Sequence, residues 1–303
     1  MRHPILTTLA ALLLALGLSG AANAGPFQDG MAAYERGDHA TAFQLWRPLA
    51  DQGNARAQIN LGVMFEFGQG VPQNHAEAVK WYRTAAIQGY DLAQFSLGVM
   101  YANGQGVPQD HAEAMKWYRL AADQGNARAQ FTLGVMYDTG QGVPQNHAEA
   151  AKWYRLAADQ GLAEAQHNLG FMYSTGQGVP QNKAEAVKWY RLAADQGYTI
   201  AQYNLGFMYG KGEDVPQNNA EAVKWFRLAA DQGHAVAQLF LGAMYDNGSG
   251  VPQDHVQAHK WFNLAGAAGN EDGRKYRDEV ATKMTPAQIA EAQRLALEWK
   301  PKQ

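Results

Sequence analysis

The feature that most constrains this chain is a repeat of 36 residues. The segment from Leu97 to Thr132 is followed at once by a second copy, from Leu133 to Asn168, which differs from it at eight positions. A Leu-Gly pair recurs in the same register along most of the chain. A fixed period of this length is typical of stacked repeats, in which each unit packs only on its neighbours. The glycines of these pairs are Gly62, Gly98, Gly134, Gly170, Gly206 and Gly242.

Each repeat predicts two helices. Apolar residues recur every three to four positions from about Asn126 to Thr139, which predicts a first helix. Pro144 prevents an immediate restart, and Asn146 with Glu149 three residues later has the pattern of a helix N-cap and its reciprocal partner. We therefore expect a second helix that ends at Gly161. The same cap pattern recurs at Asn74, Asp110, Asn182, Asn218 and Asp254.

The columns that stay uniform between repeats favour a structural role. Glycine inside a helix costs about 1 kcal/mol relative to alanine, so we expect the Leu-Gly glycine to allow close approach of the paired helix. A tryptophan, a methionine and an aromatic residue also recur in every full repeat and are expected in the core. The tryptophans are Trp81, Trp117, Trp153, Trp189, Trp225 and Trp261.

Composition and the N-terminus bear on the compartment and on the partner class. The chain has 303 residues, no cysteine and a net charge of −3, so no basic surface predicts nucleic-acid binding. An apolar run from Ile5 to Leu18, followed by Ala22-Asn23-Ala24, has the layout of a secretory signal peptide over residues 1–24. The run is too short for a membrane span, which needs roughly 20 apolar residues. We expect a periplasmic or secreted protein with no membrane span after signal cleavage.

The remaining residues, 25–303, predict a single all-α solenoid domain. Residues 27–53 form a shorter unit that we expect to be an N-terminal capping repeat. Six full repeats follow over residues 54–268, and residues 269–303 are expected to be C-terminal capping helices. In this last segment Thr285-Pro286 marks a helix start, and an apolar stripe is expected to cover the end of the stack. The stripe consists of Ile289, Ala292, Ala296 and Trp299.

The assembled pattern, A-x-A-Q-x-x-L-G-x-x-Y-x-x-G-x-G-V followed by W-x-x-x-A-A-x-x-G, resembles the Sel-one-like repeat family, a relative of the tetratricopeptide repeats. The resemblance covers nearly all of the chain after residue 24. It implies a right-handed α-solenoid of stacked antiparallel helix pairs, whose first helices line a concave groove. It also implies a role as an adaptor or scaffold that binds a protein or peptide.

The columns that vary between repeats suggest where such a partner would bind. Several of them vary while staying apolar or aromatic, and their offsets of three and four residues place them on one stripe of the first helices. An apolar stripe facing solvent is otherwise a liability, so it predicts a binding surface, although interhelix packing with relaxed size limits would give the same pattern. The candidate groove residues are Ile59, Val63, Phe95, Val99, Phe131, Val135, His167, Phe171, Tyr203, Phe207 and Leu239.

Residues able to carry chemistry do not form a recognisable site. His255 and His259 are four residues apart, but no third metal ligand follows them, and Val256 stands where a zinc protease carries its glutamate. Serine-lysine pairs with catalytic spacing, a phosphate-binding glycine loop and a nucleophile elbow are all missing from the sequence. We therefore predict no catalytic residue, no metal and no cofactor.

Three functions stay open at this point. The first is an exported, non-catalytic adaptor that holds a protein or peptide in its groove. The second is a cell-wall binder whose groove aromatics stack on glycan. The third, a β-lactam hydrolase, depends only on the association of cysteine-rich relatives in the resembled family with β-lactams, and this chain supplies no matching nucleophile and base.

Overall fold

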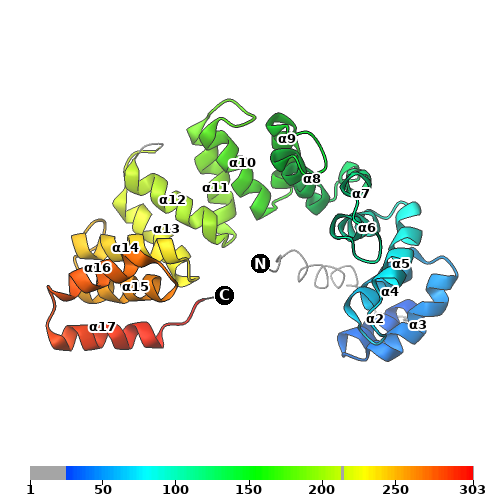
Figure 1. Ribbon diagram of the computed structural model, residues 1–303, viewed down its shortest axis with the longest axis horizontal. Helices are drawn as coiled ribbons and strands as arrows, with labels where there is room; N and C mark the ends of the chain where they lie inside the picture. Colours follow the sequence, from blue (N-terminus) through cyan, green and yellow to red (C-terminus); the bar gives the residue numbers. More distant parts are fainter. Residues whose placement is uncertain (1–24, 213–214, 303) are drawn as a thin grey trace. The chain divides into compact units, whose positions relative to one another are not determined.

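The computed structural model describes residues 25–212 and 215–302. The predicted signal peptide lies outside these ranges, as does Asp214, which stands in the sequence where the other full repeats have their second loop glycine. The described residues fold into helices joined by short loops and contain no strand (Figure 1). They form two compact units, the first ending at Asn146 and the second beginning at His147. None of the described helices is long and apolar enough to span a membrane.

The first unit contains seven helices within its described part, and consecutive helices pack side by side (Figure 1). They are α2 (Pro26–Glu35), α3 (His39–Asp51), α4 (Ala55–Phe67), α5 (His75–Ile87), α6 (Asp91–Asn103), α7 (His111–Asp123) and α8 (Ala127–Thr139).

The second unit begins with the partner helix of α8 in the sequence repeat and continues to the C-terminus. Its helices are α9 (His147–Asp159), α10 (Ala163–Thr175), α11 (Lys183–Asp195), α12 (Thr199–Lys211), α13 (Asn219–Asp231), α14 (Ala235–Asn247), α15 (His255–Ala267), α16 (Glu271–Ala281) and α17 (Pro286–Glu298). The predicted bounds of the two helices in the repeat around Asn146 are thus confirmed to within about two residues.

The Leu-Gly glycine lets the two helices of each hairpin approach closely, as predicted. A Cβ atom placed on Gly62 would lie 2.5 Å from Cε1 of Tyr82 on the paired helix, and one on Gly98 would lie 2.7 Å from the ring of Tyr118. Real Cβ atoms essentially never come this close to another atom. The helix-propensity cost of glycine is therefore offset by packing of an aromatic ring directly on the backbone.

The hydrophobic cores join consecutive repeats. One core combines Tyr190 of α11 with Leu205 and Met208 of α12 and with Trp225 of α13. The next core has the same composition one repeat later, with Phe226 in place of the tyrosine. Because repeats within a unit complete the core of their predecessors, each unit is stabilised by nearest-neighbour contacts.

The N-caps predicted for α5, α7, α11, α13 and α15 are present, but the reciprocal glutamate contacts predicted for the first four are not. Asn74 accepts hydrogen bonds from the backbone N–H groups of Ala76 and Glu77, as an N-cap should. The Glu77 side chain does not complete the box and instead lies 3.6 Å from the ammonium of Lys80. The reason is that the backbone N–H of Asn74 already donates to the carbonyl of Phe65, at 2.8 Å. The same correction applies to Asp110, Asn182 and Asn218.

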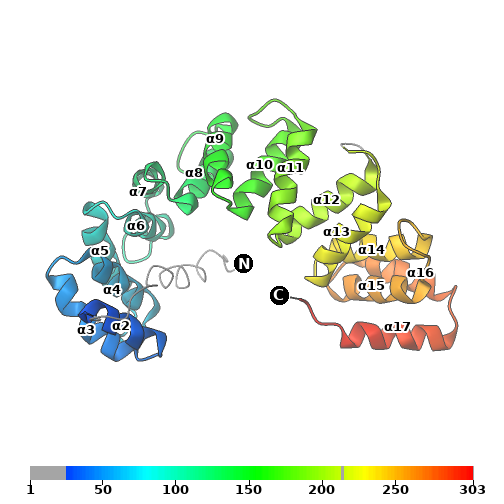
Figure 2. The same cartoon turned by 180° about the vertical axis from the view of Figure 1, so that it is seen from behind.

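The C-terminal helices end the second unit. Thr285 and Gln288 make both halves of a capping box at the start of α17. This helix packs along α15, with Ala292 and Ala296 buried (Figures 1 and 2). The ring of Trp299 meets that of Trp261 edge-on, at 6.5 Å between centroids. The predicted stripe therefore covers a core tryptophan of the last full repeat.

Candidate partner-binding site

In the first unit, four of the candidate groove residues are buried, although the sequence predicted that they face solvent. The exposed fraction of the Phe95 side chain is 2%, and its ring lies 5.6 Å from that of Tyr118. Ile59 and Val63 belong to a core that includes Tyr82. Val99 is also buried. The expectation of solvent exposure is wrong for these four, because each is buried in the packing of its unit.

The remaining candidates are more accessible. Phe131 and Val135 on α8 are half-buried. In the second unit, 48% of Phe171 on α10 is exposed, and the other four candidates of that unit are half-buried. Those four are His167, Tyr203, Phe207 and Leu239. Partner contact at these positions stays a prediction.

Tyr203 and Phe207 of α12 belong to an aromatic cluster in the second unit. The cluster also contains Phe226 of α13 and Phe240 of α14, whose rings stack with centroids 5.2 Å apart and planes 7° from parallel. The ring of Tyr203 lies 6.2 Å from that of Phe240 and stacks on His234 at 4.8 Å. Burial lowers the pKa of His234, which favours its neutral form beside these rings.

His167 is the polar member of the candidate set and is held by its neighbours. Its Nε2 atom lies 3.1 Å from the side-chain amide of Asn204, and its ring lies 5.3 Å from that of Tyr198. Burial lowers the pKa of His167, and the hydrogen bond to Asn168 acts in the opposite direction. We therefore assign His167 to the packing between α10 and α12, where its neutral form is favoured.

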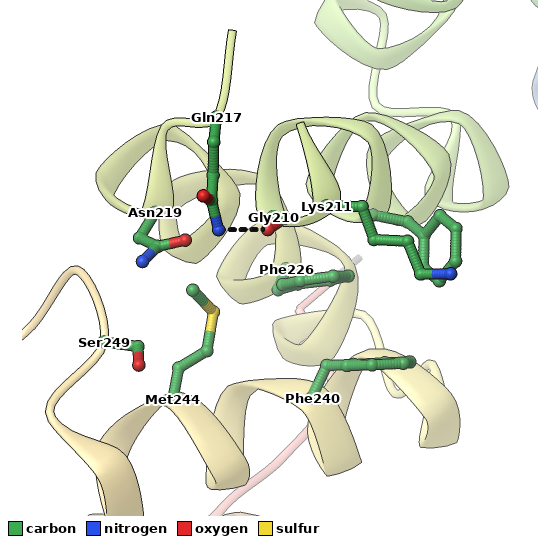
Figure 3. Close-up of a pocket in the computed structure, with 9 residues that line it drawn as sticks. Gly210, Lys211, Gln217, Asn219, Phe226, Phe240, Met244 and Ser249 are labelled. Atoms are coloured by element: carbon green, nitrogen blue, oxygen red, sulfur yellow. Dashed lines mark hydrogen bonds between the residues drawn. The ribbon is translucent and has the colours of Figure 1, made fainter. Parts of the chain in front are cut away.

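A pocket of about 270 Å³ lies at one end of the aromatic cluster (Figure 3). Phe226, Phe240 and Met244 line it from the apolar side, and Lys211 lies at its edge with its ammonium 4.7 Å from the ring centre of Phe207. Its lining residues come from α12, α13, α14 and the loops that follow α12 and α14. They are Phe207, Gly210, Lys211, Gln217, Asn219, Phe226, Phe240, Met244 and Ser249.

Two small substitutions in the repeat pattern open this pocket. In the first full repeat, Glu66 stands in place of Gly210 and Tyr82 in place of Phe226. The hydroxyl of Tyr82 donates a 2.6 Å hydrogen bond to the buried carboxylate of Glu66. The second unit has Gly210 and Phe226 instead, so both the carboxylate and the hydroxyl are missing. A Cβ atom on Gly210 would meet no atom closer than 3.6 Å. Space that Glu66 and the Tyr82 hydroxyl fill in the first full repeat is therefore open here.

Sequence reasoning identified Phe207 but missed most of this pocket. The strongest signal that it could have used is Phe240, an apolar ring in a column that is otherwise small or polar. Met244 was assigned to the core with the rest of its column, and its side chain does reach both the core and the pocket. The other members of the Phe240 column are Asn60, Ser96, Thr132, Asn168 and Asn204.

The described residues offer no metal site. Over residues 25–212 and 215–302, no group of three or more histidine, aspartate or glutamate side chains is placed to hold a metal ion. His255 and His259 have different surroundings, since His259 is buried and His255 lies 3.5 Å from a carboxylate oxygen of Asp246.

Stacked helix hairpins with a shared core between neighbours define the class of helical-repeat solenoids. Within this class the chain belongs to the Sel1 repeat family, because the family model matches seven consecutive segments that together span most of its length. The matched segments are 21–54, 55–90, 91–126, 127–162, 163–198, 199–234 and 235–270. The first of them includes the unit that the sequence predicted to be an N-terminal cap.

Solved structures give the same result. A Sel1 repeat protein from Oxalobacter formigenes is 32% identical, with a TM-score of 0.70, over 80% of this chain and 97% of that one. A protective antigen of uropathogenic Escherichia coli with the same type of fold is 28% identical, with a TM-score of 0.51, over 90% of this chain and 83% of that one. No curated protein matches the chain in sequence. Sel1 repeat proteins generally mediate protein–protein interaction.

Proposed function

We propose that this protein is an exported, non-catalytic adaptor that binds a protein or peptide along the first helices of its second unit. The observation that carries the proposal is a row of apolar and aromatic side chains on α10, α12 and α14 that the fold leaves partly exposed. Phe171, Tyr203 and Phe207 are its aromatic members. Aromatic side chains contribute large contact areas and are enriched where proteins bind proteins.

Export is the part of this proposal that depends on the sequence alone. The apolar run before Ala22-Asn23-Ala24 supports it. Cell fractionation with N-terminal sequencing tests it, and the expected mature protein begins at Gly25. A full-length protein recovered from the cytoplasm would contradict export without affecting the binding proposal.

The binding proposal is tested by replacing the exposed aromatic residues. The variant Phe171→Ser, Tyr203→Ser and Phe207→Ser should lose a partner that the wild type captures by crosslinking in living cells, as identified by mass spectrometry. Loss of one buried aromatic contact at an interface typically costs 1 kcal/mol or more of binding, so three together should reduce capture at least tenfold.

The chain offers a matched control on the second helices of the same unit. Leu156, Leu192 and Leu228 occupy one repeat column and are each more than 40% exposed. Replacing these three with serine removes a similar amount of exposed apolar surface and should leave capture intact. Equal loss in both variants, with helix content preserved, would show that the first helices are not the binding face.

A further inference from the structure

The pocket has a polar end. At the equivalent positions elsewhere in the chain, a loop glutamine contacts a histidine at the start of a second helix. Nε2 of Gln177 lies 2.9 Å from Nε2 of His147, thirty residues earlier in the preceding repeat, and Gln141 makes the corresponding but longer contact with His111. In these two places the contact links a loop to the start of the preceding second helix. At the pocket the corresponding residue in the loop is serine, and the residue at the start of the helix is asparagine.

Ser249 and Asn219 are the two replacements, and both are too short to reproduce the contact. Within the described residues neither side chain makes a hydrogen bond, and both line the pocket. Their amide and hydroxyl groups are therefore available to a ligand. By contrast, the amide of Gln217 is already used, because it donates to the backbone carbonyl of Gly210 at 2.9 Å.

The two ends of the pocket differ in chemistry. Figure 3 shows Phe226 and Phe240 at one end, Asn219 and Ser249 at the other, and Met244 between them. The apolar end favours a flat ring, since aromatic rings pack well against the edges and faces of other rings and against a methionine sulfur. The polar end favours a hydroxyl or amide at the far side of that ring. A ligand of this kind is apolar along its body and polar at its tip.

We propose that this pocket binds a tyrosine side chain of the partner, with the ring against Phe226 and Phe240 and the hydroxyl hydrogen bonded to Asn219 or Ser249. This inference rests on the proposed function, because it names the residue by which a bound protein or peptide is anchored. Tyrosine has the required apolar ring and polar tip. A lysine or arginine side chain is disfavoured, because the ammonium of Lys211 already lies over the face of Phe207.

Small amides test the pocket without the partner. The protein is labelled with ¹³C at its methionine methyl groups and titrated with N-acetyl-tyrosinamide or N-acetyl-phenylalaninamide. The Met244 signal, assigned with the Met244→Leu variant, should shift and saturate because a bound ring lies beside it. The tyrosine amide should bind about fivefold more tightly, the effect of one additional neutral hydrogen bond. Equal affinity for the two amides, or an unmoved Met244 signal, would overturn the proposal.

Two double variants close the pocket by restoring the pattern of other repeats. Gly210→Glu with Phe226→Tyr recreates the Glu66–Tyr82 pair, and Asn219→His with Ser249→Gln recreates the contact made by His147 and Gln177. Each should abolish the Met244 shift while the other methionine signals stay in place. The two pairs are independent, so one of them still tests the proposal when the other fails to fold. Retained binding in a folded closed variant contradicts the proposal.

The matched control is Phe262→Tyr. It makes the same change one repeat later than Phe226, outside the pocket, and should leave the tyrosine amide bound as in the wild type. Amide binding and partner capture also test the two proposals separately. When no amide binds but capture still depends on Phe171, only the tyrosine assignment is overturned. When the amide binds but capture does not depend on the first helices, the proposed function is overturned instead.

Discussion

At the scale of single residues, identical positions in different repeats have different surroundings. The Leu-Gly glycine leaves no room for a side chain because an aromatic ring lies against its backbone. Gly210 is also a helical glycine, but it faces the pocket. Two glycines with similar backbones therefore have opposite tolerance for a methyl group.

This difference gives a first prediction. Gly98→Ala should lower the free energy of unfolding by about 1–3 kcal/mol, the usual cost of overpacking, because its Cβ would lie 2.7 Å from the Tyr118 ring. Gly210→Ala should be neutral or raise it by up to about 1 kcal/mol, since alanine favours the helix and meets nothing closer than 3.6 Å. Urea unfolding of both variants measures the difference. Equal destabilisation would mean that helix position, not the facing ring, decides the cost.

Glu66 is the buried carboxylate of the first unit and predicts a pH dependence. Burial raises the pKa of Glu66, and the hydrogen bond from Tyr82 opposes this to a smaller extent. A folded-state pKa above the unfolded value means that the folded protein holds this proton more tightly. The stabilisation is present below the unfolded pKa, about 4.5, and is lost as the pH rises through the folded pKa.

The variant Glu66→Gln tests this direction. Glutamine keeps an oxygen acceptor for the Tyr82 hydroxyl but cannot become charged. Its stability relative to the wild type should therefore improve as the pH rises from 4.5 to 7.5. Thermal unfolding across this range, with the half-buried Glu113→Gln as the control, measures the change. A constant difference between Glu66→Gln and the wild type would show that the carboxyl does not change protonation in this window.

At the scale of helices and loops, repeated polar residues join one element to the next. The buried Gln94 donates from Nε2 to the carbonyl of Ala86, near the end of the preceding second helix, at 3.2 Å. Gln124 in turn donates to the side chain of Gln94 at 2.7 Å. A helix end leaves carbonyl groups without an intrahelical partner, so this glutamine column satisfies them. Arg83 makes a similar link to the hydroxyl of Tyr101 in the next hairpin. Equivalent pairs recur at multiples of 36 residues, as Arg155–Tyr173, Arg191–Tyr209 and Arg227–Tyr245.

The helix caps give an element-scale prediction. Asp110→Ala removes an acceptor for the backbone N–H groups of Ala112 and Glu113 and should cost about 1 kcal/mol. Glu113→Ala removes only an exposed pair with Lys116 and should cost at most about 0.5 kcal/mol. Chemical denaturation of the two single variants compares these costs. If the Glu113 variant were as destabilised as the Asp110 variant, the glutamate would have a role in the cap.

At the scale of the whole molecule, each core is shared only by neighbouring repeats, so disturbances should stay local. A Cβ on Gly206 would lie 2.6 Å from the ring of Phe226, which predicts that Gly206→Ala loosens the packing of α12 on α13. Hydrogen exchange should accelerate in α11 to α14 and stay unchanged in α3 to α5. Mass spectrometry of peptic peptides measures this. Faster exchange throughout both units would indicate global rather than neighbour-limited coupling.

The sequence alone determined the helical-repeat class, the register of the helices in the full repeats and the identity of most core residues. Periodicity sufficed for this, because each repeat has to bury the same face in the same way. Helix starts were also predictable, since an N-cap is a local arrangement of one side chain and the next turn. The reciprocal half of the cap was not, because the backbone N–H of Asn74 finds its acceptor, Phe65, on another helix.

Exposure and the pocket were decided only by tertiary structure. Phe95 and Phe171 stand in different columns of the same predicted stripe, yet one is buried and the other is half exposed. Burial depends on what a neighbouring helix presents at that point, which no spacing within one helix specifies. The pocket likewise arises where Gly210, Phe226, Asn219 and Ser249, spread over about forty residues, are each smaller than most of their equivalents. Each replacement is visible in the sequence, but only the packing of three helices brings the lost volumes together.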